Sequence, residues 1–374
     1  MQRFVHPPRL DYVAKLESHG MVYHTTDDGP YWDETAHYEF TPSEIDTLEA
    51  ATVELDRICL EAVEVVLSQG RLGEFHIPED YHDWIAESWE RDERTINGRF
   101  DLCFDGRSPP KLLEYNADTP TGLLEAAVSQ WFWLQDCHPH RQQFNSIHER
   151  LIEAWRAARH GRSGRILFTA MADHPEDWMT IQYLRDTAMQ AGWETDSLTI
   201  DQLGWDGDRR CFTDQNENPI ADCYKLYPWE WLFLDRFGPH LLEADTRWLE
   251  APWKAILSNK AILPVLWELN PGHPNLLEAA HQPLPSGSYV QKPILSREGA
   301  NIRIVENGWP IAQTQGPYTG PSIFQQLCKL PNFDGNYPVI GSWVVNGWPC
   351  GIGIREDRTL VTGNLSRFVP HCFG

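Results

Sequence analysis

The sequence lacks the features that mark a membrane protein, a metal-cluster protein or a disulfide-rich secreted protein. Its eight cysteines are scattered, without a CxxC pair or a zinc-like spacing, so we expect reduced thiols. No apolar run approaches the ~18 residues that a membrane-spanning helix needs, and no charged-then-apolar leader opens the chain. Internal repeats and low-complexity segments are absent as well. We therefore expect a cytoplasmic protein.

Positive charge is also scarce. The 31 basic residues are outnumbered by 54 acidic ones, which gives a formal net charge of -23. Such a surface repels nucleic acid and anionic membranes, so we expect neither as a partner. The 41% of hydrophobic residues and the 17 tryptophans are typical of a well-packed globular protein, and 374 residues suffice for two or three interlocked lobes.

The most informative stretch is RFDLCFDGRSPPKLLEYNADTPTGLL, residues 99–124. Its first half alternates apolar and polar residues, which places Phe100, Leu102 and Phe104 on one face of a strand. The turn-forming segment DGRSPP follows, and residues 111–116 resume the alternation. We expect a β-hairpin.

The polar faces of the two expected strands carry Arg99 and Asp101 on one and Glu114 and Asn116 on the other. If the faces coincide, three oxygen donors lie beside one guanidinium, as a magnesium-bound polyphosphate requires. The alternative is the solvated face of an edge hairpin. A helical run, GLLEAAVSQWFWL, comes next, and we expect Thr119 and Thr121 to cap it with Pro120 in the first turn, which would make a receptor for a carboxylate.

The run from Gly98 to Glu125 closely resembles the glutathionylspermidine synthetase family, and within it the single-domain relatives named as acid–amine ligases. These are ATP-grasp enzymes that join a carboxylate to an amine through an acyl phosphate, using ATP and Mg²⁺. The resemblance implies that Arg99 is the catalytic arginine, which also contacts ATP. It further implies magnesium ligands at Asp101, Glu114 and Asn116 and substrate contacts at Thr119 and Thr121.

A βαβ pattern follows, with RILFTAM as a strand, residues 175–192 as a helix and ETDSLTI as the second strand. Glu176 and Asp177 lie just after the first strand, where such units bind ligands. The family has an acidic pair in the corresponding loop that holds substrate, so the resemblance implies that this pair binds an amine. The alternative is capping of the helix by two acids. Leu226 replaces a hydroxyl residue that the family uses near glutathione, which puts glutathione itself in doubt.

From about residue 249 the resemblance implies a nucleotide-binding lobe. Lys260 and Lys292 match the two phosphate-contacting lysines, and Gly299 matches a lid glycine near the phosphates. Residues 322–330 would pack against adenine. Arg355 falls where the family has a second substrate or phosphate arginine, against the alternative of a surface arginine in a turn.

Together these features predict an α/β (α+β) protein with an ATP-grasp fold and a preceding βαβ lobe of the pre-ATP-grasp kind. The expected parts are residues 1–160, 161–248 and 249–374. We expect an ATP-dependent ligase acting on a small-molecule carboxylate, peptide-like ones included, and an amine. The family's amidase domain is not part of the resemblance, so we expect no hydrolysis. A carboxylate kinase and a non-catalytic ATP-binding module are the alternatives on the same fold.

Overall fold

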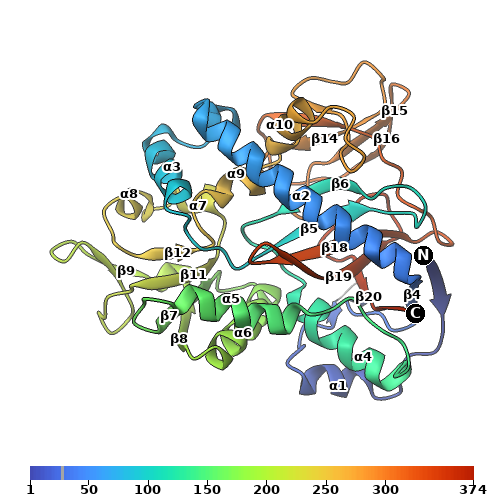
Figure 1. The fold of residues 1–374 in the computed structure, drawn as a ribbon, viewed down its shortest axis with the longest axis horizontal. Helices are drawn as coiled ribbons and strands as arrows, with labels where there is room; N and C mark the ends of the chain where they lie inside the picture. The colour runs from blue at the N-terminus through green and yellow to red at the C-terminus, as the bar shows by residue number, and fades with distance from the viewer. Residues whose placement is uncertain (27–28) are drawn as a thin grey trace.

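A five-stranded antiparallel sheet occupies the middle of the molecule, with its strands in the order β20-β19-β18-β5-β6 (Figure 1). The computed structural model describes residues 1–26 and 29–374. The hairpin predicted from the sequence is confirmed and supplies β5 and β6, while the C-terminal part of the chain supplies the other three strands. The bounds are β5 Asn97–Cys103, β6 Lys111–Asn116, β18 Tyr337–Val345, β19 Trp348–Asp357 and β20 Arg367–Val369.

The turn between β18 and β19 is the Asn346-Gly347 pair. Both residues have positive φ angles, of 48° and 78°. This conformation suits a two-residue hairpin turn, because its twist matches that of the flanking strands. The long hairpin places Gly341 of β18 beside Asp101 of β5, in the middle of the sheet.

The long helix α2, Pro42–Ser68, crosses the central sheet (Figure 1). It begins in a capping box in which the Thr41 hydroxyl accepts from the Glu44 amide, while the Glu44 carboxylate accepts from the Thr41 amide. Its apolar positions recur with helical spacing and are buried against the sheet; they include Leu48, Leu55, Ile58 and Ala62.

A four-stranded parallel sheet, β12-β11-β7-β8, contains the predicted βαβ unit. The unit consists of β7 Arg165–Ala170, α6 Pro175–Gln190 and β8 Glu194–Thr199. Helix α5, Ile147–Arg159, packs beside α6 and also contacts β18 and β19. The remaining two strands are β11 Asp222–Leu226 and β12 Arg247–Leu249.

A third sheet, antiparallel and in the order β13-β17-β14-β15-β16, lies on the other side of the hairpin (Figure 1). Its strands are β13 Ala279–Ala280, β14 Tyr289–Pro293, β15 Arg303–Glu306, β16 Trp309–Gln313 and β17 Ser322–Gln326. Helices α9, Lys254–Ser258, and α10, Ile262–Leu269, connect it to α2 and β6.

The two chain termini meet in a small sheet, β1-β4-β21, formed by Gln2–Val5, Ala36–Phe40 and His371–Phe373. β21 runs parallel to β4, and β1 runs antiparallel to it. The other elements are α1 Tyr12–Ser18, β2 Thr25–Thr26, β3 Gly29–Pro30, α3 His82–Glu90, α4 Gln130–Cys137, β9 Gly204–Asp206, β10 Cys211–Thr213, α7 Trp229–Leu232 and α8 Gly238–Leu241.

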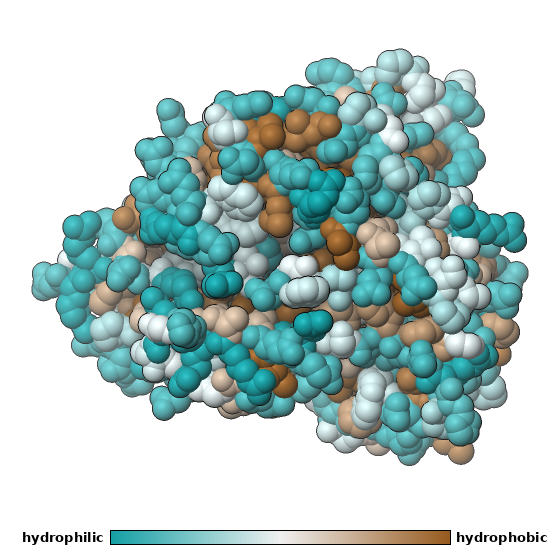
Figure 2. All heavy atoms as spheres, viewed as in Figure 1, coloured by the Kyte–Doolittle hydropathy of each residue, from teal (hydrophilic) through white to brown (hydrophobic). Residues whose placement is uncertain are grey.

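The division into 1–160, 161–248 and 249–374 stays a prediction, and the central sheet takes strands from both the first and the last part. Among the residues described, no helix combines the length and the apolar character needed to cross a bilayer. The face seen in Figure 2 is mainly hydrophilic, in keeping with the large negative charge. All eight cysteines are free thiols.

Candidate active site

The hairpin brings its four polar residues together on one wall. Across the strands Arg99 pairs with Asn116, and Asp101 pairs with Glu114. A bulge after Asp101 shifts the register, and the wall forms where the pairing is still regular. The alternate residue Phe100 is fully buried on the opposite face, as the alternation predicted.

Arg99 is held by three hydrogen bonds. Its Nε and Nη2 donate to the two carboxylate oxygens of Asp101, at 2.7 and 3.1 Å, and its Nη1 donates to the Thr121 carbonyl oxygen at 2.5 Å. Burial opposes the charge, but Asp101 and Glu114 outweigh it and raise the pKa of Arg99. The guanidinium therefore stays charged in a fixed orientation. Asn116 Nδ2 also donates to Asp101, at 3.1 Å.

The stem of Arg99 passes over Gly341. A Cβ atom at position 341 would lie 2.8 Å from Arg99 Cδ, which is closer than real contacts allow. The guanidinium carbon lies 5.8 Å from the centre of the Trp343 ring, within the range of a cation–π contact. Both neighbours come from β18, which the sequence motif does not include.

Two buried lysines reach the wall. One comes from β14 of the third sheet, and the other comes from the connection between α9 and α10. Lys260 Nζ lies 3.1 Å from Glu114 Oε2 and donates to the Ser296 carbonyl oxygen at 2.5 Å. Lys292, on β14, donates to the Leu113 carbonyl oxygen at 2.8 Å. Burial opposes ionisation of Glu114, but the two ammonium groups outweigh it and lower the pKa of that carboxyl to about 2. Burial lowers the pKa of Lys292 to about 8.

The wall and the lysines line one cavity of about 520 Å³. Eleven of the twelve residues named from the sequence line it, and Glu176 does not. Of the segment 322–330, expected to pack against adenine, residues 325–330 also line it. The eleven are Arg99, Asp101, Glu114, Asn116, Thr119, Thr121, Asp177, Lys260, Lys292, Gly299 and Arg355.

The expected helix cap at Thr119 and Thr121 is wrong. The helix begins at Leu123, its first turns are a π-helix over Glu125–Ser129, and no side chain caps it, so Pro120 lies outside the helix. The Thr119 hydroxyl instead accepts from Arg297 Nη1 at 2.7 Å. Since both threonines line the cavity from a loop, their hydroxyls are positioned by tertiary contacts rather than by helix capping.

An acidic group lies at the end of the cavity, at the N-terminus of α6. Burial, together with the nearby carboxylates of Glu176 and Glu298, raises the pKa of Asp177 to about 7. Glu176 is turned away from the cavity and accepts from the Tyr31 hydroxyl at 3.2 Å. A cluster of carboxyl groups at this spacing favours a cationic ligand, because a positive charge would relieve the repulsion between the carboxylates.

Arg355 and Gly299 meet the loop of residues 360–366. Arg355 lies within β19, not in a turn, and its Nη2 donates to the carbonyl oxygens of Gly363 and Asn364 at 2.7 and 2.9 Å. Gly299 has a φ of 69°, and a Cβ there would lie 2.5 Å from the Thr362 carbonyl oxygen. The loop packs closely against the segment that carries Gly299, so it covers this side of the cavity.

Two contributors were missed by sequence reasoning. Arg297 lines the cavity and joins Glu230 to Thr119. Asp118 and Lys225 form a fully buried ion pair of 2.6 Å that connects the motif loop to β11. Asp118 adjoins the predicted motif residues, but nothing in the spacing indicates that its partner lies 107 residues further on.

The family description "Glutathionylspermidine synthase preATP-grasp" matches residues 3–374. A protein of Haemophilus influenzae named "Putative acid--amine ligase" is 43% identical, over 98% of each chain. The bifunctional glutathionylspermidine synthetase/amidase of Escherichia coli is 30% identical over 89% of this chain. Trypanothione synthetase of Crithidia fasciculata is 28% identical over 82% of it. The chain spans 58% and 51% of these last two proteins.

Among solved structures, a glutathione synthetase-like effector from Globodera pallida is similar with a TM-score of 0.61 at 12% identity, covering 98% of this chain and 96% of that one. This likeness concerns the fold and confirms the predicted α/β class. Because the family match extends over nearly the whole chain and the two bacterial relatives are 43% and 30% identical, the chain belongs to the glutathionylspermidine synthase family, whose members have a preATP-grasp fold.

Proposed function

We propose that the protein is an ATP-dependent ligase that forms an amide bond between a carboxylate and an amine through an acyl phosphate. The observation that carries the proposal is the meeting of two buried lysines with the Arg-Asp-Glu-Asn wall across one cavity. A polyphosphate needs fixed cations and hard oxygen donors in one place, and this cavity holds both. The family relatives named as ligases and synthetases support the same reaction class.

The wall fits Mg²⁺. Asp101 and Glu114 offer carboxylate oxygens, and Asn116 donates its Nδ2 to Asp101, so its amide oxygen stays available. Oxygen ligands of this kind are what the ion prefers, and bound there it would neutralise and orient the phosphates. Asp101 now pairs with Arg99, and Glu114 with Lys260. We expect these pairs to loosen when a nucleotide brings its own charges.

Each side of the cavity then has a role. Lys260 and Lys292 neutralise the phosphates, and Thr119 and Thr121 hold the substrate carboxylate, which attacks the γ-phosphoryl group. Arg99 stabilises the charge that develops on the phosphoryl group and then on the tetrahedral intermediate formed when the amine attacks. Asp177, with Glu176 behind it, would bind the cationic end of an amine substrate.

Water must be kept out, because it would hydrolyse the acyl phosphate. Gly299 and the loop of residues 360–366 form the cover that would do this, with Arg355 holding the loop. Closure over a bound nucleotide needs both segments to approach the phosphates. The lack of a Cβ at Gly299 permits their close packing.

The test supplies the protein with Mg-ATP and pooled carboxylates and amines, glutathione and polyamines included, and follows ADP release and new product mass. A new amide with one ADP per bond supports the proposal. Hydroxylamine-trapped acyl phosphate without an amide would indicate a carboxylate kinase, and nucleotide binding without ADP would indicate a binding module. Glu114→Gln is the matched control, since it keeps the shape but removes a charge, and it should release no ADP.

A further inference from the structure

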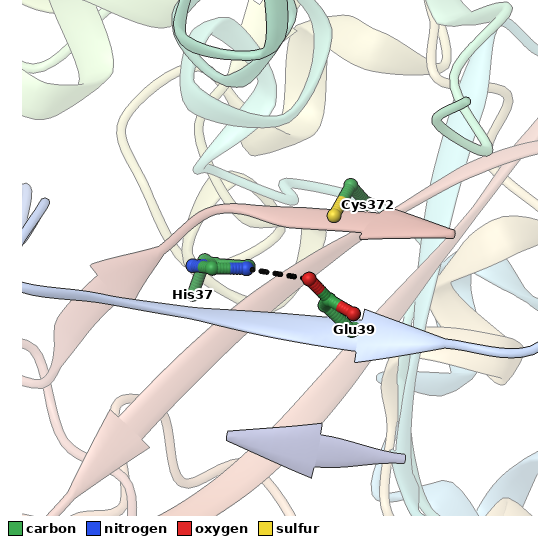
Figure 3. Close-up of side chains that lie close together, drawn as sticks. All are labelled: His37, Glu39 and Cys372. Atoms are coloured by element: carbon green, nitrogen blue, oxygen red, sulfur yellow. Dashed lines mark hydrogen bonds and ion pairs between the residues drawn. The ribbon is translucent and has the colours of Figure 1, made fainter. Parts of the chain in front are cut away.

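A histidine, a glutamate and a cysteine meet on the terminal sheet, at a site separate from the cavity. His37 and Glu39 are two residues apart on β4 and therefore share a face, and the parallel pairing with β21 places Cys372 beside Glu39. Figure 3 shows the three side chains directed toward one another. One ring nitrogen, one carboxylate oxygen and the sulfur lie within 4.8 Å of each other. None of the three lines the cavity.

The contacts among these groups leave their donors and acceptors poorly satisfied. His37 Nε2 lies 3.3 Å from Glu39 Oε1, which is long for a charge-assisted hydrogen bond. The other ring nitrogen, Nδ1, is buried without a partner in the described chain. Cys372 is a free thiol and is fully buried. The carboxylate of Glu39 is therefore paired, whereas the imidazole of His37 keeps one unpartnered nitrogen.

Their chemistry fits Zn²⁺. Zinc is bound by imidazole nitrogen, carboxylate oxygen and thiolate sulfur at about 2.0–2.3 Å, which places ligand atoms of a tetrahedral site roughly 3.3–3.8 Å apart. The His37–Glu39 distance already falls in that range. A set with one sulfur and one nitrogen disfavours magnesium and calcium, which take oxygen ligands.

The surroundings permit an ion to enter. The Glu39 side chain is 25% exposed, whereas that of His37 is 5% exposed. Arg141 Nη2 binds the other oxygen, Oε2, at 3.2 Å, so Oε1 remains directed at His37. The guanidinium orients the carboxylate, and its charge opposes the charge of a cation. Water would supply the fourth ligand of a tetrahedral site.

We propose that His37, Glu39 and Cys372 form a zinc site that links β4 to β21. Binding replaces the thiol proton with the metal, and the proton passes to solvent. The ion would add a side-chain link between β4 and residues 371–373, which are also held by main-chain pairing with β4 and by main-chain hydrogen bonds with Gln142. It would stabilise the terminal sheet without taking part in ligation chemistry.

The test uses the full-length protein, treated with a chelator and then titrated with Zn²⁺ alone against a chromophoric zinc indicator. We expect one ion per chain and a higher melting temperature. Cys372→Ser and Glu39→Gln should each weaken zinc binding at least about 100-fold. Cys211→Ser, on a different sheet, should bind as the wild type does. Arg141→Gln should bind more tightly, since it removes the opposing charge.

Cobalt(II) gives an independent readout, because a thiolate ligand produces a charge-transfer absorption band. The band should appear in the wild type and vanish in Cys372→Ser. Folded wild-type protein that takes up no stoichiometric zinc overturns the proposal, as does zinc affinity that is unchanged in the variants. If Cys372→Ser does not fold, Glu39→Gln decides, because this partly exposed side chain can change without disturbing the core.

Discussion

At the scale of single residues, Arg99 is distinguished from a simple cation by its geometry. Three of its nitrogens are committed, two to Asp101 and one to the Thr121 carbonyl oxygen. Lysine keeps the charge but cannot make the two-pronged contact. A substitution at position 99 therefore tests whether catalysis needs the fixed orientation of the guanidinium or only its positive charge.

We expect Arg99→Lys to lower kcat by roughly 10²–10³-fold while the affinity for ATP hardly changes, because a preorganised donor acts mainly in the transition state. Steady-state kinetics, with calorimetry of a non-hydrolysable ATP analogue, measure both quantities. A normal kcat with a raised KM for ATP would assign Arg99 to nucleotide anchoring. A variant normal in both would mean that Arg99 is needed neither for catalysis nor for nucleotide binding.

The lowered pKa of Lys292 predicts that the affinity for nucleotide depends on pH. Burial lowers its pKa to about 8, so the ammonium group is present below that pH and is lost as the pH rises through it. Affinity for the anionic nucleotide should be constant below about pH 8 and fall by roughly tenfold to a hundredfold above it, as a charged hydrogen bond disappears. Calorimetry across this range gives the profile. Lys292→Arg should remove the inflection, since a guanidinium does not titrate there; a persistent inflection would point to another group.

At the scale of elements, the wall depends on how β18 lies beside β5. Glycine at position 341 leaves space for the stem of Arg99, and the alternation within the hairpin alone gave no sign of this. The strand-and-turn pattern of the motif was predictable because it is local. The neighbour across the sheet was not, because β18 is more than two hundred residues away in the chain.

Gly341→Ala should therefore displace Arg99 and lower kcat by about tenfold to a hundredfold, because small misplacements of a catalytic group are costly. Circular dichroism should show an intact fold, and kinetics give the effect. Gly73→Ala is the control, because a Cβ there meets nothing within 4 Å. Equal activity of the two variants would show that Arg99 does not need this space.

At the scale of the whole molecule, the Asp118–Lys225 pair connects the motif loop to the parallel sheet. Both side chains are fully buried, and Asp118 Oδ2 also accepts from the Trp229 amide at 2.9 Å. Removing one partner leaves the other as an uncompensated buried charge. The pair therefore joins the hairpin and the βαβ lobe electrostatically.

Asp118→Asn should reduce the free energy of unfolding by about 3–5 kcal/mol. Urea denaturation measures the loss, and the double variant Asp118→Asn/Lys225→Met should recover part of it, because the buried charge is then gone. A loss under about 1 kcal/mol in the single variant would mean that the pair is not a major link between these parts.

The sequence alone could predict those features that depend on residues close together in the chain. The alternation in the hairpin, the capping box before α2 and the βαβ unit each depend on neighbours within a few residues, so period and turn chemistry suffice. The candidate site residues were named by resemblance, and the structure gathers eleven of these twelve around one cavity.

The tertiary structure decided the rest. The helix cap predicted at Thr119 is wrong. Arg297, from a distant loop, donates to the Thr119 hydroxyl, and the helix begins later in the chain, with a π-helix in its first turns. His37, Glu39 and Cys372 showed no zinc-like spacing because the chain's two ends meet only in the folded sheet. Contacts between segments far apart in the chain depend on the packing of whole sheets, and no local pattern in the sequence encodes them.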